Sequence, residues 1–196
     1  MGNLFPNRPV DPSTRMHSDG VGEYWFYHKE TFPHDEPLLY ANLISSATSM
    51  IEIWDPHFNV DRLSGDPDLF TSVQADTTIK LLTMQGLNRQ NPYLTNVLNA
   101  FKVVIPASKN VKFGLRVIDR GNGSLADWAF HDRFLIVDGN DTYLIGGSVG
   151  WHRKPNGSTG ILKLANADTV RFIRSLFDEY WKKAAGAEIP LGALHP

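Results

Sequence analysis

The order of strand-like and helix-like segments is the feature that most constrains how this chain folds. Six segments have the alternation or the β-branched and aromatic content of strands, namely 22–28, 50–54, 78–84, 111–117, 130–137 and 142–146. Three more, beginning near residues 35, 91 and 168, repeat apolar side chains at helical spacing. Strands interleaved with helices predict an α/β fold with a mixed central sheet flanked by helices.

The domain boundaries follow from changes in composition along the chain. Residues 1–21 are rich in Pro, Asn, Asp and Ser and lack periodicity, so we expect an irregular N-terminal arm. The last helical pattern ends near Gly186, where glycine can terminate a helix. We therefore expect one domain over residues 22–186 and a C-terminal tail over residues 187–196.

Composition excludes several classes of chemistry. The chain has no cysteine, which rules out disulfides, thiolate nucleophiles and cysteine-bound zinc. Its formal net charge of -2 provides no overall basic field for nucleic acid, so any polyanion site must be a local patch. No run of 18 apolar residues and no secretory signal pattern occurs, and we expect a cytoplasmic protein without a membrane span.

The segment FHDRFLIVD, residues 130–138, carries the residues best suited to chemistry, and it is followed by the sequence Gly146-Gly147-Ser148. On a strand, His131 and Arg133 project from the same face and stand about 7 Å apart. Both could touch one small anion. Asp138 lies in the turn after the strand, where its carboxylate could return toward a histidine ring nitrogen. This pattern predicts a site for a small anion.

The same residues resemble the phospholipase D superfamily, whose motif is His-x-Lys-x4-Asp followed by a Gly-Ser pair. Four positions match, namely His131, Asp138, Gly147 and Ser148. Arg133 replaces the usual Lys, and this variant resembles a bacterial subgroup. Arginine presents a planar fork of donors where lysine presents a point charge, so phosphate binding should survive the exchange. The resemblance implies a phospholipase D-like α/β fold.

The resemblance also implies a mechanism. In the family a histidine attacks phosphorus and becomes phosphohistidine, a second histidine protonates the leaving oxygen, and neither a metal nor another cofactor is needed. Carried over, His131 is the nucleophile or acid, Arg133 the phosphate clamp, Asp138 the orienting group and Ser148 a supporting donor. Fixed cations around developing phosphoryl charge agree with general electrostatic catalysis.

Two further groups of polar residues have open interpretations. The loop Trp151-His152-Arg153-Lys154 could extend the substrate-binding set of Arg133 and Gly147 by contacting phosphates or stacking a base, or it is an ordinary exposed loop. Asp55 and His57 could form part of a metal site. A strand-end Asp-Pro turn is favoured for them, because no third ligand has suitable spacing.

The chain contains one copy of the motif, whereas the family's mechanism needs two facing histidines. We therefore expect a homodimeric, metal-independent phosphodiesterase of the nuclease type, with nucleic acid favoured over phospholipid as the phosphodiester substrate. The alternative is a catalytically degenerate module that recognises phosphate in nucleic acid or phospholipid head groups. A scaffold that keeps the fold without the site is a weaker third interpretation.

Overall fold

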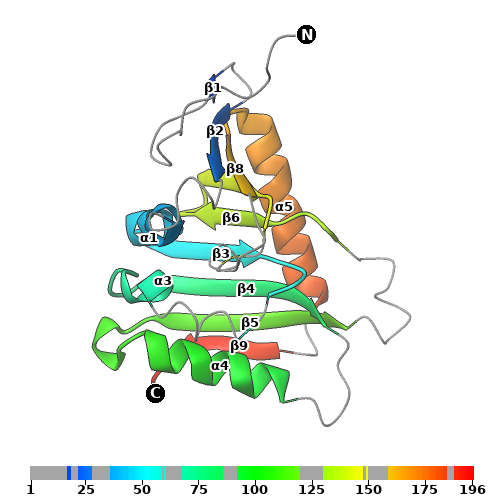
Figure 1. The fold of residues 1–196 in the computed structure, drawn as a ribbon. Helices are drawn as coiled ribbons and strands as arrows, with labels where there is room; N and C mark the ends of the chain where they lie inside the picture. Colours follow the sequence, from blue (N-terminus) through cyan, green and yellow to red (C-terminus); the bar gives the residue numbers. More distant parts are fainter. Residues whose placement is uncertain are drawn as a thin grey trace.

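A single sheet organises the chain. The computed structural model describes residues 17–18, 22–27, 36–58, 60, 68–85, 92–119, 130–147, 149, 159–184 and 188–196. Within these residues nine strands lie in the order β1-β2-β8-β7-β6-β3-β4-β5-β9 (Figure 1). Their bounds are β1 His17–Ser18, β2 Gly22–Tyr27, β3 Met50–Trp54, β4 Thr78–Gln85, β5 Lys112–Asp119, β6 Phe134–Val137, β7 Asp141–Ile145, β8 Thr159–Leu164 and β9 Glu188–Ala193.

The strand directions bring several chain ends to one end of the sheet. β3, β4 and β5 are parallel, whereas β6 runs antiparallel to β3 with Trp54 opposite Phe134. β7 is in turn antiparallel to β6. The carboxyl ends of β3 and β7 and the start of β6 therefore meet at the same end of the sheet. Ligands of open α/β sheets commonly bind outside the carboxyl ends of the strands.

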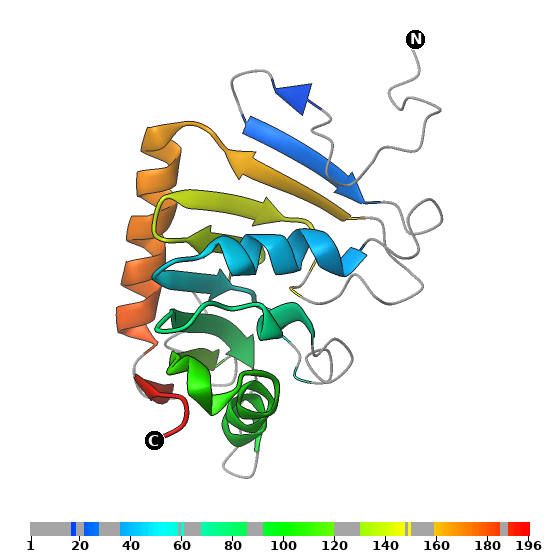
Figure 2. The same cartoon turned by 90° about the vertical axis from the view of Figure 1, so that its left-hand side faces the viewer.

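Helices cover both faces of the sheet. On one face lie α1 (Glu36–Ser46), α3 (Asp68–Thr71) and α4 (Tyr93–Val104), and a 3-10 turn over Ala107–Lys109 follows α4. On the opposite face lies α5 (Ala167–Lys183), as the two views show (Figures 1 and 2). The predicted mixed sheet flanked by helices is thus confirmed.

Two apolar clusters hold the layers together. The first joins the sheet to α1, α3 and α4. The predicted alternation over 111–117 is confirmed, because Phe113, Leu115 and Val117 of β5 and Val111, one residue before it, are all buried in this cluster. The second joins the sheet to α5 around Trp54 and Phe177. Each layer therefore buries an apolar face, which is the main stabilising contribution to such a fold.

Three expected boundaries need correction. The strand expected over 130–137 begins only at Phe134. The segment expected as a C-terminal tail contains β9, which pairs with β5 at the edge of the sheet. The expected N-terminal arm contains β1, a two-residue strand paired with β2, while the rest of the arm lies outside the described residues.

Candidate functional site

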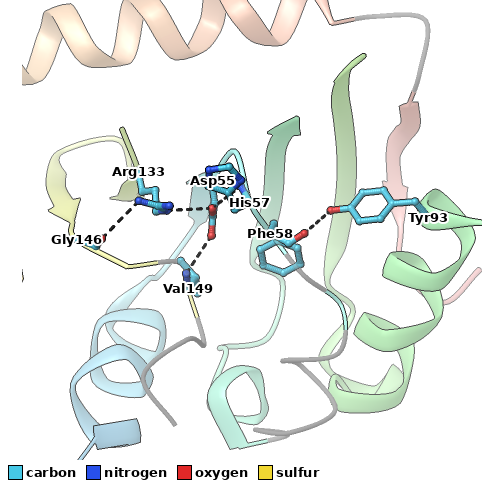
Figure 3. Close-up of polar contacts among 7 residues, drawn as sticks. All are labelled: Asp55, His57, Phe58, Tyr93, Arg133, Gly146 and Val149. Carbon is cyan, nitrogen blue, oxygen red and sulfur yellow. Dashed lines mark hydrogen bonds and ion pairs between the residues drawn. The ribbon is translucent and has the colours of Figure 1, made fainter. Parts of the chain in front are cut away.

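Three segments that are distant in sequence meet at the end of the sheet where β3 finishes. Asp55 directly follows β3, Arg133 directly precedes β6, and Gly146 directly follows β7. The Asp55 carboxylate and the Arg133 guanidinium form an ion pair, with 3.5 Å between Oδ1 and Nε (Figure 3). The two halves of the sequence motif, His131 with Arg133 and Gly146 with Gly147, are therefore brought to one place.

Asp55 is the buried centre of this arrangement. Its side chain is 0% exposed, and its two oxygens accept hydrogen bonds from separate backbone groups. Oδ1 accepts from the His57 N–H at 2.9 Å, and Oδ2 accepts from the Val149 N–H at 3.1 Å (Figure 3). The bond to the residue two positions on is the Asx turn expected for a strand-end Asp-Pro sequence. Among the described residues no group of three or more potential metal ligands is found.

Arg133 is held on two sides and is still partly open to solvent. Its side chain is 22% exposed. One Nη lies 3.5 Å from the Gly146 carbonyl oxygen, which is a long contact, and the Arg133 carbonyl accepts a hydrogen bond from the Ile145 N–H at 2.9 Å. An arginine has five N–H donors in a planar fork. With Nε turned to Asp55, the Nη groups are the ones available to an anion.

His131 is an exposed residue beside Arg133, but it is not on the strand. Arg133 also lies outside β6, so the expected strand does not include the two residues that it was expected to present on one face. The segment is fixed instead by aromatic residues at both ends. Trp54 contacts Phe130 with ring centroids 5.0 Å apart and Phe134 with centroids 5.4 Å apart. His131 lies between these two buried residues, two positions before Arg133 in the chain.

The turn that follows β3 is anchored from the helical side as well. The Tyr93 hydroxyl, at the start of α4, donates a hydrogen bond of 2.8 Å to the Phe58 carbonyl (Figure 3). The Phe58 ring is fully buried and stacks on Phe101 at 6.1 Å. The backbone from Asp55 to Phe58 is therefore tied to both the sheet and α4. A rigid support of this kind is what a positioned polar site requires.

Asp138 does not orient His131, contrary to the expectation from the motif. It follows β6, at the opposite end of that strand from His131. Its carboxylate accepts five hydrogen bonds of 2.8–2.9 Å, from the backbone N–H groups of Thr48, Ser49 and Met50 and from the hydroxyls of Thr48 and Ser49. Asp138 therefore joins the hairpin after β6 to the segment that leads into β3. Its role is structural.

The protonation of Asp138 follows from these contacts. Burial by itself would raise the pKa of the Asp138 carboxyl group. Hydrogen bonds from the Thr48 and Met50 backbone, the Thr48 hydroxyl and the Ser49 backbone outweigh burial and hold the pKa well below its usual range. The carboxylate therefore stays ionised at neutral pH, which suits an acceptor of five hydrogen bonds.

The remaining predicted site residues divide into two groups. Gly147 is described and lies partly exposed, two residues beyond the end of β7. Five others lie outside the described residues, namely Ser148, Trp151, His152, Arg153 and Lys154. Asp55 is the residue that motif reasoning missed as part of the site. Its signal in the sequence was an acid directly after an apolar strand, followed by Pro56.

Comparison with known proteins supports the fold but does not establish a family. No protein-family model and no curated protein matches the chain. Among solved structures, polyphosphate kinase from Porphyromonas gingivalis is similar with a TM-score of 0.50 and 8% identity, covering 90% of this chain and 23% of that one. This likeness shows a shared α/β fold.

Two other solved structures are similar with lower TM-scores. Nuc from Salmonella typhimurium, a phospholipase D family member, has a TM-score of 0.48 and 15% identity, covering 74% of this chain and 86% of Nuc. The archaeal chromatin protein TrmBL2 has a TM-score of 0.47 and 19% identity, covering 89% of this chain. The chain spans about half of TrmBL2 (54%).

In the described part of the chain, no helix has both the length and the apolar character to cross a membrane.

Proposed function

We propose that this protein is a phospholipase D-like phosphodiesterase of the nuclease type, in which His131 is the nucleophile and Arg133 binds the phosphoryl group. The observation that carries the proposal is the meeting of the motif's two halves at one end of the sheet. There an exposed histidine lies two residues before an arginine whose guanidinium forms an ion pair with the buried Asp55. A nucleophile beside a fixed cation is the arrangement that phosphoryl transfer requires.

The proposed reaction has two steps. A ring nitrogen of His131 attacks phosphorus, so that a P–N bond forms as the P–O bond to the leaving group breaks, and a second histidine gives its proton to the leaving oxygen. Water then attacks the phosphohistidine and gives a proton to the second histidine, which is now unprotonated, while the P–N bond breaks and a phosphate monoester is released. The Arg133 Nη groups stabilise the negative charge that develops on the phosphoryl oxygens in both steps.

The reaction is expected to need no metal ion. Hydrolysis of bis(p-nitrophenyl) phosphate or of an oligonucleotide should continue unchanged in excess EDTA, because His131 and Arg133 supply the nucleophile and the positive charge. The measurement is the initial rate with and without chelator. Loss of activity in EDTA that is restored by a divalent cation would contradict a phosphohistidine mechanism.

The second histidine is proposed to come from another copy of the chain. A C2 axis places identical residues opposite one another, so an axis near His131 would supply both histidines. We expect light scattering at micromolar concentration to report a mass near twice the 22.0 kDa of one chain. A monomer that is fully active under the same conditions would show that the second proton donor lies within the chain.

One observation favours a phosphate-recognition module as a second candidate. With Asp138 at the far end of β6, no carboxylate among the described residues contacts the His131 ring. A histidine without an orienting partner is a weaker nucleophile, whereas the Arg133 fork could still bind a phosphate of nucleic acid or of a phospholipid head group. Phosphate binding by a wild-type protein that turns over no diester would favour this alternative.

A further inference from the structure

Asp55 is the most deeply buried charged group at the proposed site, and the motif does not include it. It touches all three segments that form the site, through the His57 N–H after β3, the Val149 N–H beyond β7, and the Arg133 guanidinium before β6. A fully buried carboxylate is costly unless it is both paired and hydrogen-bonded, and Asp55 is both.

The way in which Asp55 meets Arg133 decides which donors an anion can reach. Nε, the inner nitrogen of the fork, makes the contact as an ion pair of 3.5 Å without a hydrogen bond, while one Nη lies 3.5 Å from the Gly146 carbonyl. The guanidinium is planar, so fixing the Nε edge fixes the direction of both Nη groups. The backbone hydrogen bonds of Asp55 engage both oxygens of its carboxylate and so orient it.

We propose that Asp55 is a positioning residue for the phosphodiesterase reaction, acting through Arg133. Its carboxylate holds Nε so that the Nη edge is presented to the phosphoryl oxygens beside His131. This inference rests on the proposed function, because it assumes that Arg133 binds the transferred phosphoryl group. A charge held in place before the substrate arrives needs no reorganisation in the transition state.

The structure offers a matched control on the same strand. Glu52, within β3, is also a buried carboxylate, with 3% of its side chain exposed, and it forms an ion pair of 2.9 Å with Lys80. Asp55→Asn and Glu52→Gln each remove one buried negative charge with little change of shape. Both should lower the melting temperature, and only Asp55→Asn should affect catalysis.

The test is a double-mutant cycle with Asp55→Asn and Arg133→Lys, measured as kcat and KM for bis(p-nitrophenyl) phosphate at a temperature where every variant is folded. Lysine keeps a positive charge beside Asp55, whereas Arg133→Ala would leave a buried charge unpaired and could unfold the protein. Lysine has no planar fork for a carboxylate to orient. If Asp55 acts through the arginine, its effect should disappear in the lysine background.

We expect Asp55→Asn to lower kcat about tenfold or more in the wild-type background, with little change in KM, because misplacing a catalytic group raises the barrier more than it weakens binding. In the Arg133→Lys background the same change should alter kcat by less than about twofold. Glu52→Gln should retain the wild-type kcat.

Two kinds of result overturn the inference, and they are distinguishable. In the first kind, the wild-type protein is active, and either the effects of Asp55→Asn and Arg133→Lys on kcat simply multiply or Asp55→Asn retains the wild-type kcat, as Glu52→Gln does. Asp55 then has no positioning role, and the proposed function is unaffected. If wild-type protein hydrolyses no diester, the proposed function fails, and this inference fails with it.

Discussion

Replacing His131 with alanine should lower kcat for phosphodiester hydrolysis by about a thousandfold or more, which is the scale seen when a covalent nucleophile is removed. Binding of inorganic phosphate should change little, because a nucleophile acts chiefly in the transition state. The fold should also be unaffected, since His131 is exposed and precedes β6. Turnover and phosphate binding by the purified variant measure the two effects separately.

A matched control lies one residue away. Asp132 is also exposed and belongs to the same short segment between Phe130 and Phe134. Asp132→Asn should therefore retain activity within about threefold, since surface substitutions usually have small effects. Equal losses in the His131 and Asp132 variants would mean that the segment, and not the imidazole, matters. Full activity of His131→Ala would place the chemistry elsewhere.

The second large effect concerns stability. Asp138→Asn should lower the free energy of unfolding by about 2 kcal/mol or more, because it removes the charge that five donors surround and turns an amide NH₂ group toward donors. Asn is the appropriate replacement because Asp138 has a φ of 50°, a left-handed conformation that Asn tolerates. Chemical denaturation at neutral pH measures the loss.

The control for this prediction is Asp141→Asn, at the other side of the same turn. Asp141 forms an ion pair of 2.8 Å with Lys163, and both side chains are substantially exposed. Removing its charge should cost less than about 1 kcal/mol. Equal losses at Asp138 and Asp141 would show that the five hydrogen bonds contribute no more than a surface charge.

The lowered pKa of Asp138 also predicts a pH dependence. Because the pKa is below the unfolded value near 3.9, the folded state keeps the carboxylate ionised longer as pH falls. Its contribution to stability is therefore complete above about pH 5 and is lost progressively as the solution is acidified further. Wild-type protein should lose more stability between pH 6 and pH 3 than Asp138→Asn does. Parallel curves for the two proteins would contradict the assignment.

Sequence patterns predicted the layers of the fold better than the ends of its elements. The alternation of Val111, Phe113, Leu115 and Val117 correctly predicted a strand with one buried face. The strand over 188–193 was missed because it lies at the sheet edge, contains Pro190 and Gly192, and is largely exposed, so it has no apolar period. The strand expected from 130 was too long, since Phe130 is buried by the aromatic residues around Trp54 and not by strand pairing.

The candidate site was predicted in part for a related reason. Consecutive antiparallel strands place the segment with His131 and Arg133 and the segment with Gly146 and Gly147 at one end of the sheet. The motif could not show that the Asp138 carboxylate lies away from His131, because the residues that donate hydrogen bonds to it are about 90 positions earlier in the chain. The pairing of Asp55 with Arg133 depends on the same kind of long-range contact, between β3 and β6.

The most direct test of the central claim is to look for the covalent intermediate. Wild-type protein is mixed with an excess of a phosphodiester in EDTA, quenched under alkaline denaturing conditions that preserve P–N bonds, and digested for mass spectrometry. The account predicts a phosphoryl adduct on the peptide that contains His131, which disappears in His131→Ala. Continued turnover with no adduct on that peptide, or an adduct on another residue, would contradict the proposed mechanism.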